Sequence, residues 1–235
     1  DTHVPPPTNF EFGGERDVVI SVDYNGFSAP AQAAFQYAVD IWASQLTSSV
    51  PIIVDAYWED IPGTTLGYAG ATYYYVDFAG APESNTFYPS PLADKLAGYD
   101  LGGSDIEATF DSGTNWYFGI DGNPGGGQFD FVSVVLHELG HGLGVVGSGE
   151  VVGSIGYMGL SGDPIIYDSN VQNGSGTPIL NYSDGSTSLG SQLTGNDLFW
   201  FGTQASVNNG NIPPKLYAPG TWEPGSSYSH LDENT

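Results

Sequence analysis

The sequence has no cysteine, only three lysine and arginine residues, and a single methionine among its 235 residues. Without cysteine, neither a disulfide nor a thiolate metal site can form. The three basic residues stand against 27 aspartates and glutamates, which gives a net charge of −24. A surface of this sign repels nucleic acid phosphates and anionic lipids, so we expect neither as a partner. It favours solubility, or the binding of calcium.

Long apolar runs are absent as well. No stretch of about 18 apolar residues occurs, so we expect no membrane span. The printed sequence starts with "DTHVPPPTNF", which has neither the basic region nor the apolar region of a signal peptide. If the protein is exported, its signal is therefore not in this sequence. Hydrophobic residues make up 40% and aromatics 14%, the composition of a globular protein with a sizeable core.

The first 144 residues carry regular patterns. Periodicity and β-branched content predict an amphipathic helix over 28–46 and strands over 16–24, 50–61, 71–78 and 104–111. We read these as an α+β layer, a sheet backed by helices. After Gly144 the chain is rich in Gly, Ser and Asn, with one short helix expected over 194–202. We therefore expect one domain with two subdomains, 1–144 and 145–235.

The segment "FDFVSVVLHELGHGLG" carries the strongest chemical signal. In a helix, His137 and His141 are four residues apart and lie on one face, where two imidazoles can bind one metal ion. Glu138 lies at the flank, where it can act as a general base on water. Asp130 is the expected N-cap, and Gly144 the expected left-handed residue that ends the helix. The glycines at 140 and 142 suggest close packing against another element.

A catalytic zinc needs a third protein ligand. The position six residues after His141 is Gly147, which cannot bind metal, and Glu150 is too close in a segment without helical pattern. Asp163 and Asp168 are possible in loops, and His3 lies in a proline-rich segment. His230, in "APGTWEPGSSYSHLDE", is the preferred third ligand.

Two blocks together, "VVLHELGHGLG" and "LYAPGTWEPGSSYSHLDE", resemble those of secreted bacterial metallopeptidases related to leishmanolysin, in the metzincin clan. Stretches such as "DPIIYDSNV" extend the resemblance from Arg16 to Glu233. It implies a metzincin-like α+β fold: an upper subdomain with a twisted mixed sheet backed by helices, and a loop-rich lower subdomain that supplies the third ligand. It also implies one catalytic Zn²⁺ on His137, His141 and His230, with Glu138 as base.

The chain departs from the clan at two points. Leu231 follows the third histidine where tryptophan is frequent, and we interpret this as a packing change. The clan has a methionine-containing turn after the third ligand, whereas the single methionine here, Met158, precedes it. We therefore expect either that the printed sequence is a piece of a longer chain or that this support is missing.

The function implied by the resemblance is that of a secreted, extracellular, monomeric zinc endopeptidase acting on proteins or peptides. Tyr228 is a candidate contact for the oxyanion or the zinc, with aromatic packing as the alternative. An edge strand, either 71–78 or 104–111, would align the substrate. Residues 121–130 offer carboxylates and carbonyls that suit a structural Ca²⁺ site, with an ordinary capped loop as the favoured alternative. The competing function is a zinc-containing binding or adhesion domain without catalysis, against which the presence of Glu138 argues.

Overall fold

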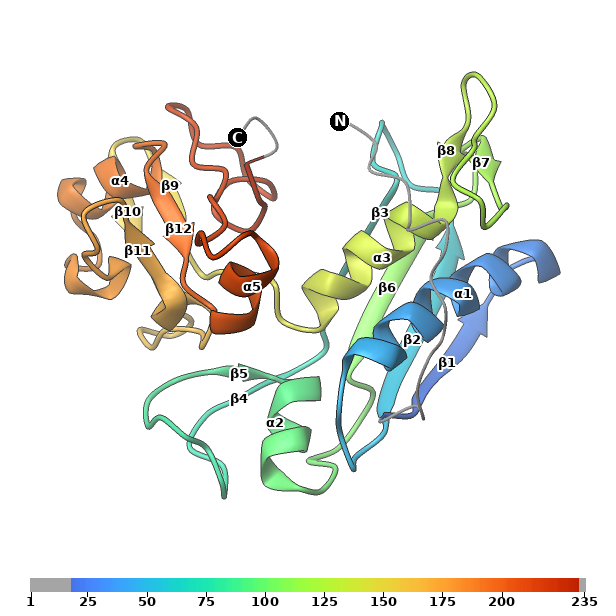
Figure 1. Ribbon diagram of the computed structural model, residues 1–235, viewed down its shortest axis with the longest axis horizontal. Helices are drawn as coiled ribbons and strands as arrows, with labels where there is room; N and C mark the ends of the chain where they lie inside the picture. The colour runs from blue at the N-terminus through green and yellow to red at the C-terminus, as the bar shows by residue number, and fades with distance from the viewer. Residues whose placement is uncertain (1–17, 233–235) are drawn as a thin grey trace. The chain divides into compact units, whose positions relative to one another are not determined.

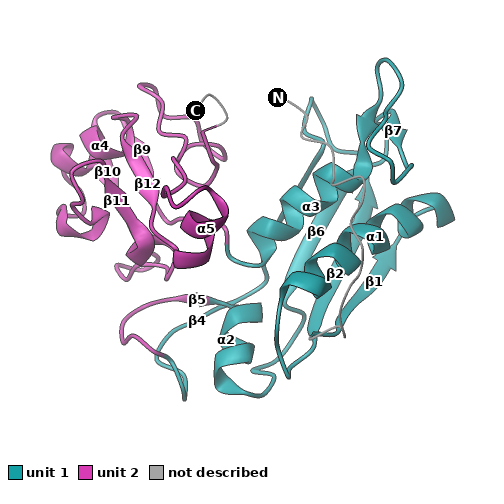
Figure 2. Cartoon of the chain, viewed as in Figure 1, with its two compact units in different colours: residues 1–81, 89–144 teal, residues 82–88, 145–235 magenta. Residues whose placement is uncertain are grey.

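The structure is a computed structural model and describes residues 18–232 (Figure 1). Within this range the chain forms two compact units (Figure 2). Unit 1 comprises residues 18–81 and 89–144, and unit 2 comprises residues 82–88 and 145–232. The chain thus enters unit 2 after Gly144. The short segment 82–88 belongs to unit 2 as well, although the sequence analysis included it in the first subdomain.

Unit 1 contains a four-stranded mixed sheet in the order β1-β2-β6-β3. The first three strands are parallel and β3 is antiparallel to β6. The strands are β1 (Ile20–Asn25), β2 (Ile52–Glu59), β6 (Ile106–Asp111) and β3 (Gly67–Ala71). Several buried positions of β2 and β6 hold small or β-branched residues, among them Val54, Ala56 and Ala108. Because these side chains are short, helices can pack closely on that face.

Two helices of unit 1, α1 (Ala29–Gln45) and α3 (Phe131–Gly142), lie side by side along the sheet (Figure 1). Ser28 caps α1 by accepting a hydrogen bond from the backbone N–H of Ala31, which agrees with the predicted start of this helix. The indole N–H of Trp42 on α1 donates to the carbonyl of Leu136 on α3 at 3.1 Å. The contact helps to hold the two helices in register.

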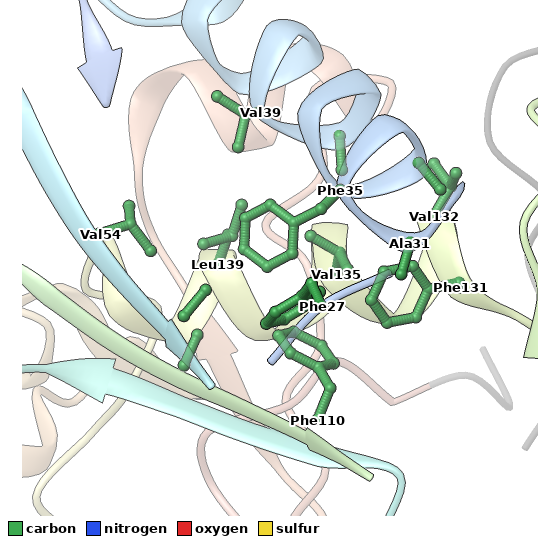
Figure 3. Packing of buried hydrophobic residues seen from close by; sticks show 14 of the residues in the cluster. Phe27, Ala31, Phe35, Val39, Val54, Phe110, Phe131, Val132, Val135 and Leu139 are labelled. Carbon is green, nitrogen blue, oxygen red and sulfur yellow. The ribbon is translucent and has the colours of Figure 1, made fainter. Parts of the chain in front are cut away.

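The core of unit 1 is an aromatic cluster between helices and sheet (Figure 3). Phe35 comes from α1, Phe110 from β6 and Phe131 from the first turn of α3, and all three are fully buried. Phe131 packs edge-to-face on Phe110 and on Trp116, with ring centroids 5.3 and 4.9 Å apart. Burial of such rings contributes about 1.5–3 kcal/mol each. This cluster anchors the N-terminal end of the helix that carries the histidines.

The strand predicted over 71–78 is wrong for most of its length. Strand β3 ends at Ala71, and only Tyr74–Tyr75 form a further short strand, β4. The backbone N–H of Thr72 still bonds to Asp105, but the carbonyl of Tyr73 accepts from Ser90 instead of continuing the ladder. Asp77 has a positive φ of 51°. The chain therefore leaves the sheet although its tyrosines have high strand propensity.

The remaining elements of unit 1 are short. Helix α2 (Ser90–Ala97) was not predicted. The other strands are two residues long: β7 (Trp116–Tyr117), β8 (Phe129–Asp130), and β5 (Tyr88–Pro89), which spans the change of unit.

Unit 2 is built from short elements. Two antiparallel pairs, β9 with β10 and β11 with β12, are accompanied by α4, α5 and two 3₁₀ turns. Their bounds are β9 (Glu150–Val152), β10 (Ile155–Tyr157), η1 (Asp168–Asn170), β11 (Val171–Asn173), η2 (Ile179–Asn181), α4 (Thr187–Leu193), β12 (Leu198–Trp200) and α5 (Thr203–Asn208).

The helix predicted over 194–202 is also wrong. Thr194 ends α4, Asn196 has a φ of 53°, and residues 198–200 form strand β12, in which Leu198 pairs with Asn173. Leu198 is fully buried in this pairing, so tertiary packing decides its conformation. No helix found among residues 18–232 has the length and apolar character required to cross a bilayer.

Candidate metal centre

Helix α3 begins and ends as the sequence predicts. The Asp130 carboxylate accepts a hydrogen bond from the backbone N–H of Ser133 at 2.9 Å, which satisfies one of the open donors of the first turn. At the other end, Gly144 has a φ of +113°, and its N–H donates to the carbonyl of His141. A Cβ on Gly144 would lie 2.8 Å from Pro89 Cγ. The position therefore needs glycine for its conformation and for space.

The two histidines of α3 converge through their Nε2 atoms. These atoms are 3.1 Å apart, and the rings are nearly perpendicular, with centroids 4.8 Å apart. Zinc–nitrogen bonds of about 2.0–2.1 Å in tetrahedral geometry place two ligand nitrogens roughly 3.3 Å apart. A hydrogen bond between two neutral imidazoles would give a similar separation. The geometry of His137 and His141 therefore fits two ligands of one metal ion, as their spacing predicts.

Glu138 lies beside this pair and faces the edge of the sheet. Its half-buried carboxyl accepts a hydrogen bond from the backbone N–H of Ala69 on β3. Burial raises the pKa of Glu138 to about 7, and the Ala69 hydrogen bond opposes that rise. A carboxyl with a pKa near neutrality can both accept and release a proton at physiological pH. A divalent cation nearby would favour its ionised form.

His230 belongs to unit 2, and its ring is oriented by its own chain. Nδ1 lies 2.8 Å from the carbonyl oxygen of Ser226, which can only accept a hydrogen bond. Nδ1 therefore carries the proton in the neutral ring, and Nε2 has the lone pair. A carbonyl partner on the second ring nitrogen is the arrangement in which metal-binding histidines are usually held. The role of His230 as the third ligand stays a prediction.

Asp168, an alternative third ligand, and Tyr228, a candidate contact for the oxyanion or the zinc, are both hydrogen-bonded inside unit 2. Asp168 is fully buried, and its carboxylate accepts hydrogen bonds from Ser148, Ile165 and the hydroxyl of Tyr228. Burial raises its pKa, and these hydrogen bonds lower it. The Tyr228 hydroxyl is thus engaged in the interior of unit 2, and the packing alternative for Tyr228 is the one observed.

Of the remaining candidate ligands, the structure describes Asp163 and Glu150. Asp163 lies in a turn, where its backbone pairs with Leu160, and Glu150 is exposed on β9. His3 lies outside the described residues.

The chain belongs to the SPBPB7E8-like family. The family model matches residues 24–204, which include α3 with both of its histidines and Glu138. No curated protein and no solved structure matches the chain. The matched range ends before His230, so the family match covers only the α3 part of the predicted metal centre.

The sheet edge beside Glu138 is β3, which corrects the sequence analysis. Strand β6, one of the two candidates for the edge, lies between β2 and β3. Leu66 and Thr72 form backbone hydrogen bonds with Asp111 and Asp105 at the two ends of the β3–β6 ladder. Because hydrogen-bonded positions alternate in an antiparallel pair, the backbone groups of residues 67, 69 and 71 face the free edge. The bond from Ala69 to Glu138 agrees with this register.

The hydrogen bonds within residues 121–130 are those of an ordinary capped loop. The Asp121 carboxylate accepts from the Tyr117 hydroxyl and the Asn123 backbone, a local turn. Asp130 caps α3 through Oδ1. Among the described residues, its Oδ2 is buried and lacks a hydrogen-bond partner. The calcium site stays a prediction.

Sequence reasoning did not find Ala69 and Ser226, the partners of Glu138 and His230. Both act through backbone groups, so no residue type at these positions could indicate the role. The pattern of small residues in "GYAGA" is consistent with a close approach of α3 to β3, and it is the one signal that could have pointed to this contact.

Proposed function

We propose that the protein is a zinc-dependent endopeptidase that hydrolyses peptide bonds with Glu138 as general base. The observation that carries the proposal is the convergence of the His137 and His141 Nε2 atoms at 3.1 Å, with the Glu138 carboxyl on the same turn of α3. His137 and His141 would hold the metal together with His230. The orientation of His230 by the Ser226 carbonyl supports this third role.

Zinc, when bound, supplies Lewis acidity that lowers the pKa of water and polarises a carbonyl. Glu138 accepts the proton of the attacking water and passes it to the nitrogen of the leaving amine. Its position between a metal-binding face and the Ala69 N–H keeps the carboxyl oriented during both transfers. A purely structural metal site would have no use for a carboxyl at this position.

The free edge of β3 supports a peptide as the substrate. A peptide in extended conformation can pair with the outward backbone groups of residues 67 and 71 and with the carbonyl of Ala69, as an added strand does. This edge also carries the Ala69 N–H that orients Glu138. We therefore propose that the strand that aligns the substrate and the residue that moves the proton are in direct contact. The protein substrates are expected to be extracellular.

The deciding experiment compares wild type with Glu138→Gln. Glutamine has the same shape, so the variant should retain about one zinc per chain, while cleavage of casein falls by at least about 100-fold because the proton acceptor is lost. Glu107→Gln is the matched control, since Glu107 is exposed on β6 of the same unit and the substitution changes the net charge equally. Its activity should equal that of wild type.

Two further variants test the metal itself. His137→Ala and His230→Ala should each lose zinc, measured by elemental analysis after dialysis. Casein cleavage by Glu138→Gln at the wild-type rate would refute the mechanism. Zinc bound at full stoichiometry without any cleavage in wild type would instead favour a binding or adhesion domain.

A further inference from the structure

Among the described residues of unit 2 (magenta in Figure 2), Asp168 carries the most completely enclosed carboxylate. Its side chain is 0% exposed. Four uncharged donors surround it: the Ser148 N–H at 3.0 Å, the Ser148 hydroxyl at 2.5 Å, the Ile165 N–H at 2.9 Å and the Tyr228 hydroxyl at 3.0 Å. An enclosed carboxylate held only by neutral donors is costly to bury.

These hydrogen bonds join three segments that are distant in the sequence. Ser148 follows the exit from α3, Ile165 lies just before η1, and Tyr228 precedes His230 by two residues. Asp168 is therefore the point where the chain that leaves the histidine helix meets the chain that carries the predicted third ligand. Both of these segments belong to unit 2.

Tyr228 is itself held in an unfavourable conformation. Its φ is +74°, a region that L-residues other than glycine and asparagine seldom adopt. Its ring is fully buried and lies so close to Gly147 that a Cβ there would be 2.1 Å from Tyr228 Cε1. Such a conformation persists only where several contacts determine it together.

Further bonds fix the residues around Tyr228. Its carbonyl accepts from the Tyr167 hydroxyl at 3.0 Å, and its N–H donates to the Tyr217 carbonyl at 2.7 Å. The Tyr217 N–H in turn donates to the carbonyl of His230 at 2.9 Å. The Ser229 hydroxyl accepts from Gly147. Each residue from 228 to 230 therefore has at least one contact that sets its place relative to Asp168, Tyr217 or Gly147.

From these contacts we infer that Asp168 is a positioning residue for the metal centre: through the Tyr228 hydroxyl it fixes the backbone that presents the His230 imidazole. The inference rests on the proposed function, in which His230 is a ligand. It goes beyond that function by assigning the orientation of the ligand to a buried carboxylate that does not contact the metal. Loss of the Asp168 carboxylate or of the Tyr228 hydroxyl should loosen the position of His230 within unit 2.

Tyr228→Phe tests the inference because it removes one hydroxyl and keeps the buried ring. Asp168→Asn is the second variant, which exchanges one acceptor oxygen for a donor. Tyr182→Phe is the matched control: its hydroxyl accepts from Asn173 at 3.0 Å in the same unit, away from residues 226–230. Zinc affinity is measured by competition with a chromophoric chelator, and ligand geometry by the visible absorption of the cobalt(II)-substituted protein. Near-UV circular dichroism checks the fold.

We expect Tyr228→Phe and Asp168→Asn to bind zinc at least about tenfold more weakly, as for the loss of other groups that orient metal ligands. Their cobalt(II) spectra should change, and Tyr182→Phe should match wild type in both measurements. If Asp168→Asn does not fold, Tyr228→Phe decides. Wild-type zinc affinity and cobalt spectrum in folded Tyr228→Phe would overturn the inference, whatever the change in melting temperature.

His230→Ala separates this inference from the proposed function. If that variant loses zinc while Tyr228→Phe behaves as wild type, the metal centre stands and only the positioning role fails. If His230→Ala binds zinc as tightly as wild type, the proposed ligand set is wrong and the positioning role is overturned with it.

Discussion

Two glycines of α3 lie on either side of His141, and the structure predicts opposite effects when each is replaced by alanine. A Cβ on Gly140 would lie 3.5 Å from Trp42 Cζ2, an ordinary van der Waals distance. A Cβ on Gly142 would lie 2.5 Å from Ile106 Cγ2 and 3.0 Å from two further atoms of the same side chain. Ile106 is 1% exposed at the start of β6. The close packing expected from the sequence therefore holds for Gly142 and not for Gly140.

The stability changes expected for the two alanine variants have different physical causes. Alanine in a helix interior is more favourable than glycine by about 1 kcal/mol, so Gly140→Ala should stabilise the protein by about that amount. Gly142 is the last residue of α3, where the gain in propensity is smaller. The clash with a β-branched side chain in a close-packed core costs about 1–3 kcal/mol. Gly142→Ala should therefore destabilise the protein.

Thermal unfolding of metal-free protein is the appropriate assay, because bound metal would add its own stabilisation. For a chain of this size 1 kcal/mol corresponds to about 2–4 °C. We expect Gly140→Ala to raise the melting temperature by about this amount and Gly142→Ala to lower it by at least as much. A stabilised Gly142→Ala, or a Gly140→Ala that melts earlier than wild type, would refute the packing argument. Zinc stoichiometry should be unchanged in both variants.

Two further predictions concern unit 1. Asp105 is buried beside Asp94, and burial raises its pKa from 3.8 to about 6. The folded state then holds a proton that the unfolded state has released, so stability should fall as the pH rises from about 4 to about 6. Asp105→Asn should remove this pH dependence and raise the free energy of unfolding by on the order of 1 kcal/mol at pH 7.5, after allowance for screening. Urea unfolding at pH 4.5 and 7.5 measures the change. An equal change at both pH values would contradict the prediction. Phe131→Ala should lower the free energy of unfolding by about 3–5 kcal/mol because the ring is fully buried. In urea titrations Phe131→Leu should lose much less, and a loss below about 1 kcal/mol in the alanine variant would contradict the central place of this ring.

The elements that the sequence predicts well are those with strong local signals. Helix α1 has a serine cap, a proline in its first turn and apolar residues at helical spacing, and the predicted range of 28–46 differs from the observed one by one residue at each end. Helix α3 has its cap at Asp130 and its left-handed turn at Gly144. In both helices the capping groups and the periodic face lie within one short segment, so local sequence carries the information.

The missed elements depend on contacts outside their own segment. Helix α2 has Pro91 near its start and Gly98 at its C-cap with a φ of 77°, a pairing that could have indicated it. Residues 198–200 carry aromatic and aliphatic side chains that suit a short helix or a strand. They form a strand because they pair with β11. Strand propensity over 71–78 was overridden by tertiary contacts such as the bond from the Ser90 N–H to the Tyr73 carbonyl.

The sequence by itself determined the pairing of His137 with His141 and the place of Glu138 beside them, because residues four apart on a helix share a face whatever surrounds it. Only the tertiary structure decided that Ala69 of β3 bonds to Glu138 and that the Tyr228 hydroxyl donates to Asp168. These contacts join residues about 60 to 70 positions apart through backbone and buried polar groups. No local pattern encodes such pairs, since they form only when strands, helices and turns have packed together.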